Sequence, residues 1–206
     1  RLRCDWSSDV CSSDLGTTFI KLGQFLATRP DIIGEDIAKE LEKLQDKLPP
    51  FQLVEAKNIL KKELEKENFD KITNFSDPIA AASIAQVHFA TINNASEKRE
   101  VAIKILRPNI EEIFNDELDA LMLLAYIVES IIKKTKRLKL VEVVQLLREI
   151  TNVEMDLRFE AAAANELYEN TKNDVGFKVP KIYWNQTSKK VLCLEKVDGI
   201  SIREVE

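Results

Sequence analysis

Two runs of β-branched residues in the middle of the chain constrain its fold most strongly. The segments ASIAQVHFATI and EVAIKIL are rich in residues that favour strands, and the polar stretch NNASEKRE joins them. This pattern predicts two adjacent antiparallel strands. The second strand carries Lys104 in its middle. Because a buried ammonium loses its hydration, Lys104 needs either an anionic partner or a path for its long side chain to reach water.

Apolar residues recur at helical spacing on both sides of these strands. The first helical region ends before Pro49 and Pro50, through which a helix cannot continue. We expect helices at about residues 37–48 (with Ile37, Leu41, Leu44 and Leu48 on one face), 52–67, 108–136 and 140–171. Pro108 suits the first position of the third helix. Further strands are predicted in KITNF, KVPKIYW and KVLCLE, before Val197-Asp198-Gly199 interrupts the pattern.

Length and composition bound the class of protein. A chain of 206 residues with 45% hydrophobic content can bury one sizeable core. The net charge is -5 and no basic block dominates, so we expect no binding to DNA or RNA. The longest apolar region, from Leu118 to Ile132, contains Asp119 and Glu129 and is too short to span a bilayer. It is predicted to be a core helix.

The first fifteen residues differ from the rest of the chain. The segment CDWSSDVCSSDL is rich in Ser and Asp and has no apolar period. It is similar to the translation of a widely used sequencing adapter, and we expect residues 1–15 not to belong to the domain. Cys4 and Cys11 lie in this segment, and no matching His/Cys pair follows that would complete a metal site. Cys193, in an apolar run, is expected to be a small buried hydrophobe with a reduced, intracellular thiol.

Four motifs, FIKLGQFLATRPD, AAASIAQVH, VAIKILRP and EMDLRFEAAAAN, occur in this order along the chain. Together they resemble the UbiB family of atypical, protein-kinase-like ATPases, and VPKIYW and VLCLEKVDGISI are similar to that family too. The resemblance covers residues 16–206. It implies an α+β fold in which a helical N-terminal extension, residues 16–70, precedes a protein-kinase-like N-lobe, residues 71–206. This N-lobe ends in the hinge, so the chain is expected to be truncated before the C-lobe.

The resemblance assigns a role to Lys104 and to an alanine-rich loop. It implies that Glu160 pairs with Lys104 beside the α- and β-phosphates of a nucleotide. The loop takes the place of a glycine-rich loop, and a β-carbon on each residue stiffens its approach to phosphate. Close packing of these small residues against a helix is the alternative. The expected nucleotide-binding residues are Ile79, Ala80, Ala81, Ala82, Ser83, Ile84, Ala85, Gln86, Val87 and Lys104, with Leu194 at the gatekeeper position and Glu195 and Val197 at the adenine-binding hinge.

The implied N-terminal extension contributes further charged residues. By the family pattern, Lys21 and Gln24 form a Lys-x-Gly-Gln element, and Glu154 and Asp156 form a Glu-x-Asp element that meets Lys21. On a regular helix, however, Glu154 and Asp156 point about 200° apart. Either the helix is distorted there, or only one of the two carboxylates reaches Lys21. An alternative is that Glu154 forms a surface bridge with Arg158 at the next turn.

The function implied by the resemblance is an ATP-dependent, kinase-like activity that supports ubiquinone biosynthesis. The cofactor is expected to be ATP or ADP with Mg²⁺, whose ligands are expected beyond the end of this chain, so the chain alone is expected to be inactive. The expected location is the cytoplasmic face of the bacterial inner membrane, with quinone-pathway lipids and ubiquinone-biosynthesis proteins as partners. The extension is expected to fill the space of a protein substrate, which argues against ordinary protein phosphorylation. Two alternatives are a pseudokinase-like lipid-binding or scaffold protein and, less favoured, a direct 2-polyprenylphenol 6-hydroxylase, for which the chain has no flavin fingerprint, metal cluster or haem ligand.

Two remaining features have ordinary structural explanations. His88 is the only histidine, so a His-based triad or His-rich metal site cannot be built, and we expect a structural role. A basic run of residues at a predicted helix end fits a solvated terminus stabilised by the helix dipole, with attraction to an anionic membrane surface as the alternative. Its members are Lys133, Lys134, Lys136, Arg137 and Lys139.

Overall fold

The computed structural model describes residues 17–42, 49–94, 97–132 and 137–199. The chain forms two compact units, each built from several stretches of sequence. The first comprises the described residues up to Pro50 together with residues 81–85 and 107–155, and the second comprises residues 51–80, 86–106 and the described residues from Asp156 onward. The expected division at residue 70 does not coincide with this partition, because the helices before that point pack on the sheet. The segment expected to be an artefact, residues 1–15, lies outside the described residues.

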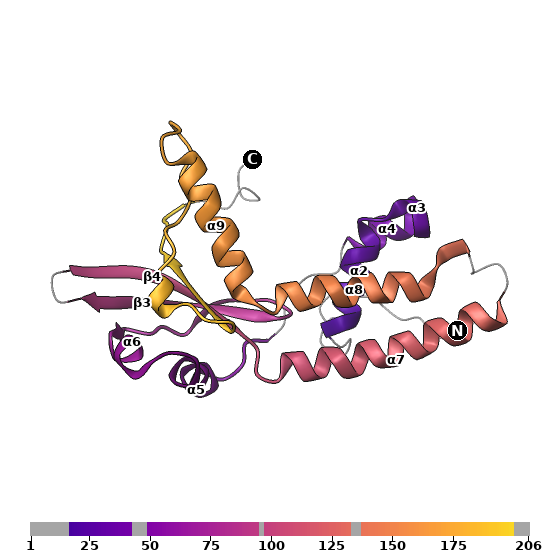
Figure 1. The fold of residues 1–206 in the computed structure, drawn as a ribbon, viewed down its shortest axis with the longest axis horizontal. Coiled ribbons are helices and arrows are strands. Elements are labelled where there is room, and N and C mark those ends of the chain that lie inside the picture. Colours follow the sequence, from indigo (N-terminus) through magenta and orange to yellow (C-terminus); the bar gives the residue numbers. More distant parts are fainter. Residues whose placement is uncertain (1–16, 43–48, 95–96, 133–136, 200–206) are drawn as a thin grey trace, which may run out of the picture. The chain divides into compact units, whose positions relative to one another are not determined.

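The first unit is helical (Figure 1). Its helices are α2 (Thr17–Ala27), α3 (Pro30–Ile33), α4 (Glu35–Leu41), α7 (Ile110–Ile131) and α8 (Leu140–Glu154). Helix α7 packs along α8, and α2 packs against α4 and α7. The buried residues of α7 lie three or four positions apart, which places them on one face. They are Ile110, Phe114, Leu118, Leu121 and Ala125.

Two of the predicted helices in this unit have different bounds. Helix α4 ends at Leu41, and the predicted residues Leu44 and Leu48 lie outside the described residues. Helix α7 begins at Ile110 rather than at Pro108, because Asn109 adopts a left-handed backbone with φ of 56° before the helix starts. None of the helices in the described ranges is both long and apolar enough to cross a bilayer.

The second unit contains an antiparallel sheet, as the strand pattern predicted. Its strands are β1 (Ile72–Thr73), β2 (Pro78–Ala81), β3 (Ala85–Asn94), β4 (Glu97–Leu106) and β5 (Val191–Glu195). The order is β1-β3-β4-β5, and β2 also pairs with β3. The two central runs of the sequence therefore form neighbouring strands. In the antiparallel pair of β4 and β5, Lys104 lies opposite Leu192.

One face of this sheet packs against helix α5 (Leu53–Glu63) and forms the core. Ala56 and Leu60 of α5 cluster with alternate residues of the central strands, which point to the same face. The core includes Cys193, whose free thiol is fully buried. Burial also raises the pKa of this thiol. The expectation that Cys193 is a buried hydrophobe is confirmed.

Two other predicted elements in this unit were wrong. The helix expected at 52–67 is interrupted at Leu64, which adopts an extended backbone and buries its side chain in the core before helix α6 (Lys66–Asp70) begins. The segment KVPKIYW contributes only an isolated bridge, Ile182 to Leu194, followed by the short 3-10 helix η2 (Trp184–Gln186). Pro180 within it has no N–H to donate to a neighbouring strand.

The helical region expected at 140–171 is two helices. Helix α8 ends at Glu154 and α9 (Leu157–Thr171) begins after Asp156, whose backbone is extended. The break lies where the first unit ends and the second resumes.

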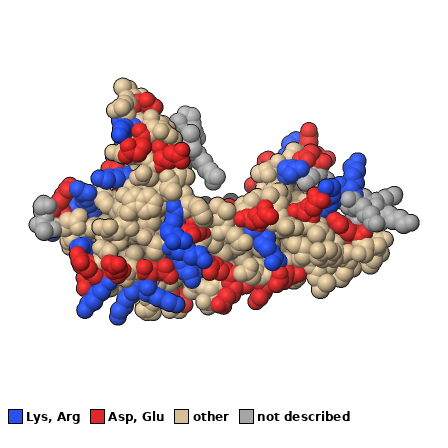
Figure 2. Space-filling model, in the orientation of Figure 1, with Lys and Arg blue, Asp and Glu red and all other residues tan. Residues whose placement is uncertain are grey.

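Acidic and basic side chains are interspersed over the face of the molecule shown in Figure 2.

Candidate functional site

The alternation of strand β4 sets the direction of Lys104. Ile103 and Ile105 are fully buried and face α5. Because successive side chains of a strand point to opposite faces, Lys104 projects from the other face of the sheet. Lys104 is only partly buried, which leaves its ammonium within reach of water and ligands.

Helix α9 carries the partner of Lys104, and local hydrogen bonds fix where this helix begins. The side chain of Asp156 caps the helix by accepting the N–H of Arg158 at 3.1 Å. The N–H of Leu157 donates to the carbonyl of Lys189 at 2.9 Å. Two of the helix's first N–H groups are thereby satisfied. Glu160 lies in the first turn, where the helix dipole favours a carboxylate.

Lys104 and Glu160 form an ion pair within the second unit. The Nζ of Lys104 lies 2.7 Å from Oε2 of Glu160. The side chains are 27% and 49% exposed, respectively, so the pair is screened by solvent and contributes little to folding stability. The pair orients the ammonium toward helix α9. The structure therefore brings together the two residues that the family pattern paired.

A second ion pair lies within the first unit. The Nζ of Lys21, on α2, is 2.7 Å from Oε2 of Glu154, the last residue of α8. Lys21 is the more buried partner, with 18% of its side chain exposed against 37% for Glu154. Gln24 lies on the same helix and is partly buried. Of the two acidic residues expected to meet Lys21, the structure pairs it with Glu154.

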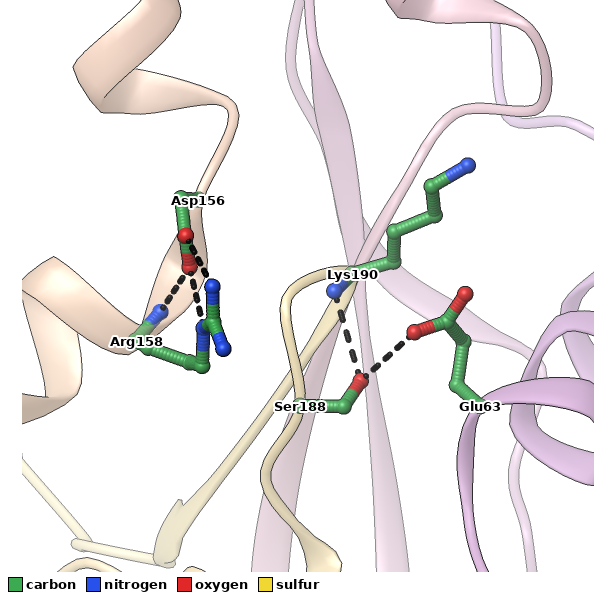
Figure 3. Close-up of polar contacts among 5 residues, drawn as sticks. All are labelled: Glu63, Asp156, Arg158, Ser188 and Lys190. Carbon is green, nitrogen blue, oxygen red and sulfur yellow. Dashed lines mark hydrogen bonds and ion pairs between the residues drawn. The ribbon is translucent and has the colours of Figure 1, made fainter.

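Asp156 is bound to Arg158 instead (Figure 3). Its two carboxylate oxygens accept from Nε and Nη2 of Arg158 at 2.9 and 2.6 Å. These hydrogen bonds hold the pKa of the Asp156 carboxyl below its usual range. The sequence left two explanations open for the Glu-x-Asp element, a distorted helix or a single carboxylate that reaches Lys21. Both apply, because the helix breaks and only Glu154 reaches Lys21. The alternative bridge from Glu154 to Arg158 is wrong, since Arg158 is paired with Asp156.

The alanine-rich loop is a tight hairpin between β2 and β3. The N–H of Ala82 donates to the carbonyl of Ala85 at 2.8 Å and closes the turn. Ser83, Ile84 and Ala85 are buried, whereas Ile79 and Ala80 are exposed. None of residues 79–87 has a positive φ. The turn therefore uses backbone angles that any L-residue adopts, and no position in it requires glycine.

Sequence reasoning missed Arg107, which binds this turn. Its guanidinium donates two hydrogen bonds to the carbonyl of Ala82. The only signal in the sequence is its position directly after strand β4, at the end of the VAIKIL run. A side chain with five donors and no acceptor must find carbonyls or anions when it is partly buried.

The side chain of Gln86 belongs to the core of the second unit. Its amide oxygen accepts the N–H of Phe51 at 2.9 Å, and its amide nitrogen contacts Nε2 of His88 at 2.9 Å. On the other side of the ring, Nδ1 of His88 lies 2.8 Å from the carbonyl of Ser76. These partners fix a neutral ring with its proton on Nδ1. His88 is fully buried and stacks on Phe75, and burial lowers the pKa of its imidazole, as its expected structural role requires.

The expected hinge residues follow strand β5. Glu195 pairs with Lys178 at 2.8 Å and accepts the N–H of Lys181, and these contacts lower the pKa of its carboxyl. Leu194 lies opposite Ala102 in the sheet, on the same face as Lys104. Val197 is exposed. Across the described ranges, no group of three or more His, Cys, Asp or Glu side chains gathers closely enough to hold a metal ion.

Comparison with known proteins places the chain in a family. The family model described as "ABC1 atypical kinase-like domain" matches residues 43–206. A protein of Marinobacter nauticus named "Probable protein kinase UbiB" is 40% identical over 193 residues, which cover 93% of this chain and 35% of that protein. A protein of the same name from Pseudomonas aeruginosa is 38% identical over 194 residues, 94% of this chain and 36% of its own length. The chain thus spans about a third of these relatives. It belongs to the family of ABC1 atypical kinase-like domains, and within that family it is similar to UbiB proteins.

Proposed function

We propose that this chain supplies the ATP- or ADP-binding part of a UbiB-type atypical kinase or ATPase that supports ubiquinone biosynthesis. The observation that carries the proposal is the ion pair of Lys104 and Glu160, with 2.7 Å between Nζ and Oε2. In kinase-like proteins a strand lysine held by a helix glutamate binds the α- and β-phosphates. This chain belongs to the family of ABC1 atypical kinase-like domains, and that membership supports the same roles for Lys104 and Glu160.

The chemistry of the pair fits a polyphosphate. An ammonium has three N–H donors, and Glu160 engages one of them. With 27% of the Lys104 side chain exposed, the remaining donors are accessible to phosphate oxygens. Glu160 holds Lys104 in place before the nucleotide arrives, so less side-chain freedom is lost on binding. Mg²⁺ bound with the nucleotide would neutralise part of the phosphate charge.

The other expected residues join the proposal in the roles that the family resemblance implies. The loop of residues 79–87 is proposed to contact phosphates, and the backbone from Glu195 to Val197 to contact adenine. Lys21, Gln24 and Glu154 are proposed to act from the N-terminal extension. The resemblance also supports membrane association of the intact protein at the cytoplasmic face of the bacterial inner membrane, with quinone-pathway lipids and proteins as partners. We further propose that the chain alone binds nucleotide without turning it over.

Titration of the purified chain with a fluorescent ADP analogue, with and without Mg²⁺, tests this function. Saturable binding is expected, and Lys104→Met should weaken it at least about tenfold, because a charge-assisted contact to phosphate is lost. Lys71→Met is the matched control: Lys71 also lies 2.7 Å from a glutamate oxygen and is 32% exposed, but it is the C-cap residue that follows α6. Absence of saturable binding, or equal affinities for wild type and Lys104→Met, would overturn the proposal. ATP hydrolysis by the chain above background would contradict the expected lack of turnover.

A further inference from the structure

We propose that Arg107 is a positioning residue, which holds the alanine-rich turn in the geometry that binds phosphate. The inference rests on the proposed nucleotide-binding function and adds a residue that the family resemblance did not assign. Arg107 follows strand β4 directly, three residues after Lys104. All the contacts that carry the inference lie within the first unit.

Arg107 holds the turn by its side chain and by its backbone. Nε and Nη2 donate to the carbonyl of Ala82 at 3.0 and 2.9 Å. Nη2 also donates to the carbonyl of Pro49 at 2.9 Å. The backbone N–H of Arg107 donates to the carbonyl of Ile84 at 2.9 Å. Arg107 therefore binds the carbonyls of Ala82 and Ile84, which belong to the same turn, and the carbonyl of Pro49 from a distant segment.

Peptide planarity turns these contacts into control of the loop amides. In a trans peptide the C=O of one residue and the N–H of the next lie in one plane and point in opposite directions. Because Arg107 fixes the carbonyl of Ala82, it also fixes the direction of the following peptide N–H. The bond to Ile84 does the same for the N–H of Ala85. Phosphate-binding loops depend on the directions of such successive backbone amides.

The hydrogen bonds from Arg107 to the turn also explain how alanine can serve in place of glycine. The turn has no positive φ, so its shape is one that alanine adopts readily. A planar guanidinium with two donors on one oxygen adds a fixed geometry that a single-donor side chain cannot reproduce. A turn built from β-carbon-bearing residues and held by Arg107 is stiff, so a nucleotide would not have to order it first.

Three variants separate positioning from a general effect on folding. Arg107→Gln removes the charge and the two-donor fork, and Arg107→Lys keeps the charge without the fork. Arg99→Gln is the control, because Arg99 lies on β4, the strand that Arg107 follows, and is paired with Glu97 at 2.6 Å, but it does not contact the turn. Each chain is titrated with the fluorescent ADP analogue. Hydrogen exchange of the amides at residues 82–85 is measured without nucleotide.

We expect Arg107→Gln to bind the ADP analogue about tenfold more weakly than wild type, with Arg107→Lys between them. The amide of Ala82 should exchange faster in Arg107→Gln, while core amides of β4 keep their protection. Arg99→Gln should match wild type in both measurements. Unchanged exchange in the turn would overturn the positioning role. Faster exchange with unchanged affinity would reduce Arg107 to a structural residue and overturn the inference.

The same experiment distinguishes this inference from the proposed function. If the wild-type chain binds no nucleotide, the proposed function fails, and the claim about phosphate fails with it. The exchange measurement is made without nucleotide, and it still decides whether Arg107 fixes the turn. If wild type binds and Lys104→Met does not, while Arg107→Gln behaves as wild type, the function stands and the inference about Arg107 is wrong.

Discussion

The ammonium of Lys104 and the carboxylate of Glu160 meet at 2.7 Å, although 56 residues separate them in the sequence. Strand alternation directs the lysine away from the core, and the capped start of α9 places the glutamate in the first helical turn. Both side chains are partly exposed. A pair of this kind adds little to stability in solvent, and under the proposed function it would instead hold Lys104 ready for phosphate.

Glu160→Gln is therefore expected to affect nucleotide affinity more than stability. Loss of the charge should change the free energy of unfolding by less than about 1 kcal/mol, because the pair is screened. The affinity for the ADP analogue should fall several-fold, because the ammonium of Lys104 is no longer held in place by a carboxylate. Urea denaturation and fluorescence titration measure the two quantities on the same preparation.

Glu67→Gln is the matched control for this substitution. Glu67, on helix α6, also pairs with a lysine at 2.7 Å, but that lysine is Lys71, the C-cap residue of the same helix. Glu67→Gln should leave the affinity unchanged and cost a few tenths of a kcal/mol in stability. Should Glu160→Gln and Glu67→Gln give the same nucleotide affinity, the pairing of Lys104 would have no part in binding.

The second ion pair predicts a specific coupling in the first unit. Lys21 is mostly buried, so Lys21→Met leaves Glu154 without its partner and should destabilise the chain by about 1 kcal/mol or more. Adding Glu154→Gln should restore part of that loss, whereas adding Asp156→Asn should not. Double-mutant cycles from urea denaturation give both coupling energies. A larger coupling of Lys21 to Asp156 than to Glu154 would contradict the observed pairing.

The strands and most helices could be predicted because their patterns are local. β-Branched alternation in β3 and β4 and apolar spacing in α7 are visible in a short window of sequence. The pairing of Lys104 with Glu160 could not be found in this way, because a contact across 56 residues leaves no periodic trace. Only the family resemblance supplied it. Arg107 was missed for the same reason, since its carbonyl partners carry no side-chain signal.

The errors have physical causes that the sequence records only weakly. Apolar spacing continues from α8 into α9, so periodicity alone gives one helix across Asp156. The signal for a break was the aspartate itself, a favoured N-cap residue, with Leu157 buried behind it. In KVPKIYW the β-branched residues indicated a strand, whereas Pro180 limits backbone pairing there.

Asp156→Ala tests the cap at this break. Removing the side chain that accepts the N–H of Arg158 should cost about 1 kcal/mol of stability, a typical cost for an N-cap. Asp156→Asn should cost less, because asparagine also caps helices. The comparison is made by urea denaturation near neutral pH. Equal stability of wild type and Asp156→Ala would show that the observed cap does not stabilise α9.

The charge state of Asp156 adds a pH dependence to this test. Its carboxyl pKa is lowered in the folded chain by hydrogen bonds from Arg158. The stability from this interaction is therefore complete above the unfolded pKa, about 3.9, and it is lost as the pH falls through the folded pKa. The difference in stability between wild type and Asp156→Asn should shrink in acid. A difference that grows as the pH falls would contradict this assignment.

His88 predicts a loss of stability at a higher pH. Burial lowers the pKa of its imidazole, against opposing effects of the Ser76 carbonyl and the nearby Asp77 charge, so the unfolded chain binds the proton more readily than the folded chain. The stability from the neutral ring is complete above the unfolded pKa, about 6.5, and it declines as the pH falls below that value. His88→Gln cannot titrate and should flatten the profile between about pH 7.5 and pH 5.5. Because the chain has a single histidine, an NMR titration of the imidazole reports on this site alone. Equal pH profiles of urea denaturation for wild type and His88→Gln would show that protonation of the buried ring does not limit stability.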